Sequence, residues 1–246
     1  NAAAERNITV VDTTNGSSYP VSEWALAMAM IGLRNAGSLY RRMIAGETPF
    51  RSNADRVADF SWNGELTGKK VGLIGCGYIG RRLLELLAPF RCDIYAYDPH
   101  VPRLLADIYD ITLTSLDQVM GCDVVISLVP LTPETQGMIT ARELDLLRPG
   151  AVFVNVSRGA VVDQAALIRR LERNDIVASL DVFDPEPLEP NSPLRNMHNV
   201  FLTPHIAGVT APCGPRFLTL AADEIARKFA GHRTRHDLVP RAAVKK

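Results

Sequence analysis

Short apolar runs alternate with helix-like segments along the chain after residue 68. Each run is mostly apolar over four to six successive positions, which is typical of strands that are buried on both faces. The runs are 71–75, 94–98, 124–128, 151–156, 177–181 and 200–203, and helical spacing lies between several of them, at 79–89, 141–147 and 163–172. The pattern predicts an α/β fold built on a doubly wound parallel sheet with right-handed crossovers.

The first 68 residues follow a different pattern. A short β-branched run at 8–11 predicts a strand, and Asn-Gly-Ser-Ser at 15–18 predicts a turn or linker. Apolar residues from 22 to about 40 suit a helix that is buried on more than one side. The polar stretch that follows has Trp62 and Leu66 as its expected anchors. A last helix is expected at about 215–230, ahead of a basic tail.

Composition narrows the class of protein. The 246 residues include 27 Lys+Arg and 27 Asp+Glu, so the formal net charge is zero, which argues against a nucleic-acid or anionic-membrane partner. The longest apolar stretch, 24–33, is too short to cross a bilayer, and no cationic and apolar leader precedes the fold, so we expect no membrane span and no secretory signal. The four cysteines form no CxxC pair, which is typical of reduced thiols in a cytoplasmic protein.

A GxGxxG pattern follows the first expected strand and opens the first expected helix. Gly75 permits the tight turn, Gly77 lets a pyrophosphate approach the backbone, and Gly80 allows the helix to pack closely on the strand. The free N–H groups at the helix start, near Tyr78 and Ile79, then face the phosphates. On their own, three glycines also fit an ordinary turn; with the flanking strand and helix they predict a Rossmann-type dinucleotide site.

A carboxylate stands where the ribose of such a cofactor is expected. Asp98 closes the next strand, 18 residues after Gly80, and can accept hydrogen bonds from the ribose hydroxyls. Because a carboxylate at this position repels a 2′-phosphate, the sequence favours NAD over NADP.

Three further polar segments each follow an expected strand, at 155–163, 181–187 and 203–208. Ligands of open α/β sheets collect at the carboxyl ends of the strands, so these segments are candidates for the reacting site.

Together with the glycine loop and residues 129–135, the three segments resemble the D-isomer-specific 2-hydroxyacid dehydrogenase family. The resemblance runs from about residue 21 to 208, with the motifs in order. It implies an oxidoreductase that transfers a hydride between NAD(H) and a 2-hydroxy or 2-keto acid of D configuration. The catalytic Arg, Glu and His of the family correspond to Arg158, Glu186 and His205.

The chemistry of these side chains suits the implied roles. Arg158 offers a planar fork for a carboxylate, and the imidazole of His205 can give and take a proton near neutral pH. A carboxylate beside that imidazole, at Glu186, favours its charged form and fixes its orientation. Taken singly, each residue also fits a solvated loop residue or a structural histidine.

The resemblance implies further contacts. Asp181 corresponds to the family residue at the nicotinamide end, Pro130 lies in the segment beside the adenosine, and the remaining expected cofactor contacts are Thr135, Val156 and Gly208. The family's counterpart of the 24–33 helix helps to form a homodimer, which we also expect here. The small-molecule partner is a 2-keto or 2-hydroxy acid.

No metal site is expected. His232 and His236 have the i, i+4 spacing of metal ligands on a helix, but they lie in a polar tail with no evident third ligand.

Family members carry a second, flavodoxin-like domain, encoded mostly before the cofactor domain. We expect residues 1–15 to be a remnant of it, 16–208 to be the NAD-binding domain, and 209–246 to be the returning helix and tail. The family loop that holds the substrate carboxylate is then missing, so the chain is either a piece of a longer enzyme or a natural short form that binds NAD without turnover.

Two other functions fit part of the sequence. One is an NAD(H)-sensing, non-catalytic module, like corepressors on this fold. The other is an NAD-dependent enzyme that acts on an amino acid or nucleoside, which explains the glycine loop but not the three later segments.

Overall fold

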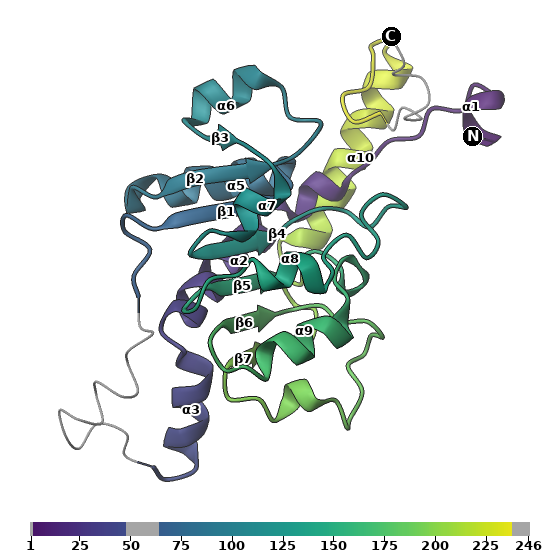
Figure 1. Ribbon diagram of the computed structural model, residues 1–246. Helices are drawn as coiled ribbons and strands as arrows, with labels where there is room; N and C mark the ends of the chain where they lie inside the picture. The colour runs from purple at the N-terminus through teal and green to yellow at the C-terminus, as the bar shows by residue number, and fades with distance from the viewer. Residues whose placement is uncertain (1, 48–63, 238–246) are drawn as a thin grey trace.

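The computed structural model describes residues 2–47 and 64–237, and a seven-stranded sheet forms its centre (Figure 1). Neighbouring strands are parallel throughout, in the order β3-β2-β1-β4-β5-β6-β7. The strands are β1 (Lys70–Ile74), β2 (Asp93–Tyr97), β3 (Thr112–Leu113), β4 (Val124–Ser127), β5 (Val152–Asn155), β6 (Val177–Leu180) and β7 (Val200–Leu202). This order confirms the predicted doubly wound sheet, with its switch point between β1 and β4. The short edge strand β3 was not predicted.

Helices cover both faces of the sheet (Figure 1). Residues of α2 (Ser18–Leu33), α5 (Tyr78–Leu87) and α6 (Arg103–Tyr109) share one apolar core with one face of the sheet. Residues of α7 (Leu116–Met120), α8 (Ala141–Asp145) and α9 (Gln164–Leu171) share a second core with the opposite face. Successive strand residues enter the two cores in turn, which is why the strands are continuously apolar. The short helices α6 and α7 have too few periodic positions for the pattern to reveal them.

The helix expected at 22–40 is two helices. It begins earlier, as α2, and α3 (Ala36–Ile44) follows after a break. Asn35 takes a left-handed conformation with φ 44°, which ends a helix at little cost for asparagine. The expected burial on more than one side is confirmed, because α2 packs against α5 as well as against the sheet. Gly32 shows how close that packing is: a Cβ there would lie 2.4 Å from Cγ1 of Val152.

The predicted strand at 8–11 is wrong. A short helix, α1 (Ala2–Glu5), stands at the N-terminus instead, and only Val11 forms an isolated antiparallel bridge, with Asp237. Ile8 and Val10 are exposed, so the β-branched run lacks the neighbouring strand that a sheet requires. In Figure 1 this segment runs beside α10 (Cys213–Phe229), the last described helix, which was predicted at nearly these positions.

Residues 15–18 form a tight turn, as predicted, but not a linker. Thr14–Ser17 is a 3₁₀ helix that leads directly into α2, and its Gly16 is buried against Phe217 of α10. Of the two expected anchors in the polar stretch, Leu66 is buried and Trp62 lies outside the described residues.

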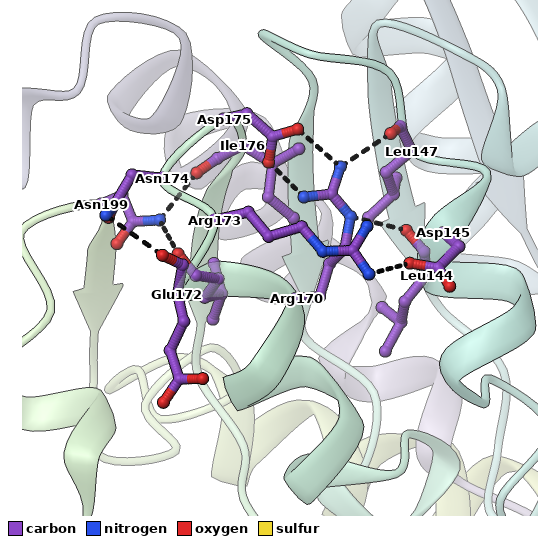
Figure 2. Close-up of polar contacts among 11 residues, drawn as sticks. Leu144, Asp145, Leu147, Arg170, Glu172, Arg173, Asn174, Asp175, Ile176 and Asn199 are labelled. Carbon is purple, nitrogen blue, oxygen red and sulfur yellow. Dashed lines mark hydrogen bonds and ion pairs between the residues drawn. The ribbon is translucent and has the colours of Figure 1, made fainter.

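A polar cluster joins α8, α9 and the start of β6 at the amino ends of the strands (Figure 2). The buried guanidinium of Arg170 donates to the carbonyls of Leu144 and Leu147 at 3.2 and 2.9 Å and pairs with Asp175. The Leu144 carbonyl, at the C-terminal end of α8, also accepts from the Leu147 N–H at 3.2 Å, so Arg170 is its second donor. The Leu147 carbonyl lies just beyond α8 and receives its donor from Arg170. The cluster therefore supports the fold at the edge opposite the candidate site.

Candidate active site

The sheet register aligns the carboxyl ends of six strands. Their last residues form one line of neighbours, which runs Tyr97, Ile74, Ser127, Asn155, Leu180 and Leu202. The loops that begin just after this line carry the glycine pattern and the three polar segments. The register thus brings the segments singled out in the sequence to one edge of the sheet.

Each glycine of the loop after β1 has its own geometry. Gly75 has φ +94°, and a Cβ there would lie 2.9 Å from Cγ1 of Val129 on the neighbouring loop. A Cβ on Gly80 would lie 3.0 Å from the carbonyl oxygen of Gly75, so the helix packs closely on the loop. Gly77 is exposed, and a Cβ there would meet no atom of the described residues within 4 Å. Packing within the protein therefore accounts for two of the glycines, and the space beside Gly77 is open to a ligand.

Asp98 ties the loops after β1 and β2 together. Its Oδ2 accepts from the backbone N–H of Cys76 at 2.8 Å, and its Oδ1 accepts from the N–H of His100 at 2.8 Å. The carboxylate thus fixes the glycine loop as well as standing at the end of β2. Its contact with a ribose stays a prediction.

A buried hydrogen-bond network shapes the loop that presents Arg158. Oδ1 of Asn155 accepts from the N–H and hydroxyl of Ser157 at 3.1 and 2.8 Å, and Nδ2 of Asn155 donates to the carbonyl of Arg158 at 3.2 Å. The Ser157 hydroxyl also lies 3.0 Å from that of Ser127 on the neighbouring strand. The Arg158 residue itself is exposed, with Nη1 donating to the Ser157 carbonyl at 2.6 Å. Three buried side chains thus hold one exposed guanidinium at the sheet edge.

The Arg158 loop presses on the loop that carries Glu186. The backbone of Gly159 lies so close to that of Asp184 that a Cβ on Gly159 would be 2.6 Å from the Asp184 nitrogen. Only a glycine fits at this crossing of two backbones, so the second polar segment is held against the first.

The third polar segment, 203–208, places His205 beside Glu186. Nδ1 of His205 lies 2.7 Å from Oε1 of Glu186, and their side chains are 42% and 34% exposed. Nε2 of His205 has no partner among residues 2–47 and 64–237 and is left for another proton acceptor or donor. His205 itself has φ 55°, a left-handed conformation that occurs at functional sites when the surrounding structure enforces it.

Hydrogen bonds to Asp181 hold the backbone around His205 in this conformation. Fully buried, Asp181 accepts from the Thr203 hydroxyl at 2.5 Å and the Ile206 N–H at 3.0 Å through Oδ1, and from the Ala207 N–H at 2.9 Å through Oδ2. The Asp181 carbonyl accepts from the His205 N–H at 2.8 Å. Asp181 thus orients the His205 loop, and its predicted contact with the nicotinamide stays a prediction.

Residues 26–207 match the family model described as the NAD-binding domain of D-isomer specific 2-hydroxyacid dehydrogenases. The chain belongs to this family. It is 32% identical over 94% of its length to chloroplastic/mitochondrial formate dehydrogenase of Arabidopsis thaliana. It is 33% identical over 94% of its length to D-3-phosphoglycerate dehydrogenase of Mycobacterium tuberculosis.

The fold agrees with solved structures of the family. A D-isomer specific 2-hydroxyacid dehydrogenase from Xanthobacter autotrophicus Py2, in complex with NADPH and MES, is 28% identical and superposes with a TM-score of 0.77, over 96% of this chain and 72% of that one. The chain spans 59% of the Arabidopsis relative and 42% of the Mycobacterium relative.

The cofactor of this family domain is NAD, and the glycine loop fits it. The open space at Gly77 lies at the N-terminus of α5, where helix N–H groups have no partner within the helix. Nε of Arg81, one turn into α5, is buried without a hydrogen-bond partner in the described part of the chain. Open space at the N-terminus of a helix suits a phosphate group.

Cys76, the second residue of the loop, is a packing residue. Burial, with a smaller contribution from Asp98, raises the pKa of its thiol to about 11, and Arg81 opposes this shift. The thiol stays protonated at neutral pH and is a poor nucleophile.

The other expected cofactor contacts lie on neighbouring loops. The Thr135 hydroxyl donates to the carbonyl of Pro130 at 2.6 Å and accepts from the Thr132 N–H at 2.8 Å, so it shapes the loop after β4. Val156 is buried directly after β5, and Gly208 lies near the start of α2. Their contacts with NAD stay predictions, as do the roles of Arg158, Glu186 and His205.

Among the described residues, no three His, Cys, Asp or Glu side chains gather in a way that could hold a metal ion. In the tail, Nδ1 of His236 lies 3.1 Å from the Tyr78 hydroxyl. Within the described residues as a whole, no helix has both the length and the apolar character needed to cross a membrane.

Four residues that position the site were given no role from the sequence, and each is polar at or just beyond the end of an apolar strand. Asn155, Ser157 and Thr203 lie in the polar segments singled out there, whereas Ser127 lies outside them. Such a residue must find a partner when it is buried, and this requirement is the signal that could have found them.

Proposed function

We propose that the protein is an NAD-dependent dehydrogenase that interconverts a 2-keto acid and a 2-hydroxy acid of D configuration. The observation that carries the proposal is the 2.7 Å pair of His205 and Glu186, at the same sheet edge as Arg158 and the glycine loop. Its relatives are named for different substrates, formate and D-3-phosphoglycerate, so the proposal stays at the level of the acid class.

Gly77 and the N-terminus of α5 hold the diphosphate in this proposal, and Asp98 holds the ribose. When bound, NAD(H) supplies the carbon that gives or accepts the hydride. Because Asp98 is a carboxylate that would repel a 2′-phosphate, we propose that NAD is preferred to NADP in this chain, although the X. autotrophicus relative was solved in complex with NADPH.

His205 moves the proton. In the direction of reduction, the substrate carbonyl carbon gains the hydride and its oxygen gains a proton from Nε2 of His205; oxidation reverses both transfers. Glu186, 2.7 Å from Nδ1, orients the ring.

Arg158 binds the substrate. Its exposed guanidinium can pair with the carboxylate of the acid in bidentate fashion and can polarise the carbonyl that receives the hydride. The network of Asn155 and Ser157 keeps it at the sheet edge.

The test is NADH oxidation by the full-length protein with glyoxylate, hydroxypyruvate, pyruvate and longer 2-keto acids. We expect turnover with at least one acid, and a loss of roughly a hundredfold or more in kcat for His205→Gln. His198→Gln, an exposed histidine on a loop with no described side-chain contact, is the matched control and should keep full activity. Tight NADH binding without turnover of any acid contradicts the dehydrogenase and favours the sensing module.

We further propose a homodimer. Tyr40, Met43 and Ile44 of α3 are 67%, 56% and 73% exposed, and Met30 of the adjoining α2 is 45% exposed, which together offer an apolar surface to a second copy. Sedimentation velocity should give the dimer mass, and Ile44→Lys should shift it to the monomer.

Two other expectations remain proposals. The division at 1–15, 16–208 and 209–246 is supported by the pairing of the first and last segments, in which the Asp12 N–H donates to the His236 carbonyl at 2.8 Å. A cytoplasmic location is supported by the four cysteines, which are all free.

A further inference from the structure

Two side chains from distant parts of the sequence meet beside the glycine loop. The hydroxyl of Tyr78 lies 3.1 Å from Nδ1 of His236, although the two residues are 158 positions apart. Their rings pack edge to face, with centroids 5.7 Å apart. Tyr78 is the first residue of α5 and follows Gly77 directly, and its side chain is about half exposed.

The backbone on both sides of His236 is anchored. Its carbonyl accepts from the Asp12 N–H at 2.8 Å. The N–H of Arg235 donates at 2.8 Å to Oε2 of Glu224, a buried carboxylate of α10. The imidazole is therefore held against Tyr78 by bonds from two other segments.

Carboxylates near this segment are engaged elsewhere. Asp12 accepts from the N–H and hydroxyl of Thr14, Asp237 from the hydroxyl of Thr234, and Glu224 from Arg235. Tyr78 is the described partner of the His236 ring. The imidazole is thus available to an anion that approaches the loop.

We propose that residues 232–237 form a second wall of the diphosphate site, in which Tyr78 and His236 donate hydrogen bonds to the cofactor. The variable positions of the loop, Cys76, Tyr78 and Ile79, bear no cation. A diphosphate carries two negative charges at neutral pH, so donors in addition to the backbone N–H groups and to Arg81, one turn into α5, can strengthen its binding. The hydroxyl and the imidazole supply further donors at the helix N-terminus, where the dipole already favours an anion.

The inference rests on NAD binding by this domain but not on turnover of any acid. It assigns a ligand contact to a residue outside the matched family segment, which ends at residue 207.

The tail itself provides a matched control. His232 stands four residues before His236, and its N–H donates to the Arg227 carbonyl at 2.9 Å. Its exposed side chain makes no hydrogen bond or ion pair within the described residues. A substitution there changes the composition of the same segment without touching Tyr78.

Calorimetric titration of the intact chain with NADH, ADP-ribose and adenosine tests the proposal. His236→Ala should raise the Kd of NADH and of ADP-ribose about tenfold, the size of one hydrogen bond to a charged group. Adenosine, which has no phosphate, should bind equally to both proteins. Tyr78→Phe should act in the same direction, and the double variant should lose less than the product of the two single losses.

An unchanged Kd of ADP-ribose for His236→Ala, to within about a factor of two, overturns the proposal. So does an equal weakening of adenosine, because the histidine would then act on the fold as a whole, or an equal loss in His232→Ala. His236→Gln, which keeps a polar side chain, provides a second variant if the alanine protein does not fold. Turnover is read separately, so an inactive protein that shows the expected titrations contradicts only the dehydrogenase.

Discussion

The backbone of Gly159 lies against that of Phe183, so closely that a Cβ on Gly159 would sit 1.8 Å from the Phe183 carbonyl oxygen. Arg158 directly precedes the glycine, and Glu186 follows Phe183 by three residues. The separation of the proposed carboxylate-binding guanidinium and the proposed acid–base pair is therefore set by a contact between two backbones, which bends less readily than a contact between side chains.

Gly159→Ala should move these loops apart. The added methyl group overlaps backbone atoms that cannot rotate away, so we expect a loss of about 3 kcal/mol in the free energy of unfolding. Turnover of the 2-keto acid should fall more than NADH affinity, since Asp98 and the glycine loop lie on other strands. Urea denaturation and steady-state kinetics measure the two effects. In Gly121→Ala the new Cβ would have its nearest contact at 3.5 Å, an ordinary distance, and an equal loss there would refute the steric explanation.

Asp98→Asn should relax the choice of cofactor. The amide oxygen can still accept from the N–H of Cys76, but the charge that repels a 2′-phosphate is gone. The ratio of the Kd values for NADPH and NADH should fall about tenfold, which corresponds to about 1.4 kcal/mol. Fluorescence titration with both cofactors gives the ratio. Asp107→Asn, a change at an exposed residue of the nearby α6, is the control and should leave the ratio of Kd values unchanged. An unaltered ratio in Asp98→Asn would contradict the proposal that Asp98 binds the ribose.

Glu143 should make stability depend on pH in the acid range. Burial raises the pKa of its carboxyl, but hydrogen bonds from the side chain and backbone of Thr140 and from Arg142 outweigh burial and lower it from 4.5 to about 2. Because the pKa of Glu143 is lower in the folded state than in the unfolded state, its carboxylate stabilises the folded state. This contribution to the free energy of unfolding is present above pH 4.5 and is lost as the pH falls toward 2.

Glu143→Gln should therefore be less stable than the parent at pH 6, and the difference should shrink as the pH is lowered through this range. Chemical denaturation at a series of pH values gives the free energies of unfolding. Glu172→Gln is the control, because Glu172 is an exposed residue. A difference between Glu143→Gln and the parent that is constant with pH would mean that the carboxylate's charge plays no part.

Arg170→Met should be the most damaging change in the polar cluster of Figure 2. It leaves Asp175 without its partner, removes the Arg170 donor of the Leu147 carbonyl and removes one of two donors of the Leu144 carbonyl. We therefore expect a loss of about 3–5 kcal/mol in the free energy of unfolding. Arg173→Met breaks the 2.7 Å pair with Asp145 nearby, but both of those side chains are more than half exposed, and the cost should stay below about 1 kcal/mol. Thermal and urea denaturation of the two variants should separate them clearly; similar losses would mean that burial does not decide the effect.

The sequence by itself determined the sheet, the cofactor loop and the family. Six strands could be predicted because each is a local apolar run, and the spacing from Gly75 to Gly80 and on to Asp98 is carried by a single strand–helix–strand unit. The same local signals gave a wrong strand at residues 8–11, because that segment has the composition of a strand but no neighbouring strand to pair with.

Only the tertiary structure decided which residues share a site and what holds them there. The four hydrogen bonds accepted by Asp181, the crossing at Gly159 and the contact of Tyr78 with His236 all join segments that are far apart in the sequence or on different loops. Their formation depends on how the strands align and on which buried polar groups must be satisfied once the core has closed. The hydrophobic periodicity of a single segment contains neither kind of information. The sequence could therefore predict which residues are candidates for the chemistry, but not the hydrogen bonds and backbone contacts that position them.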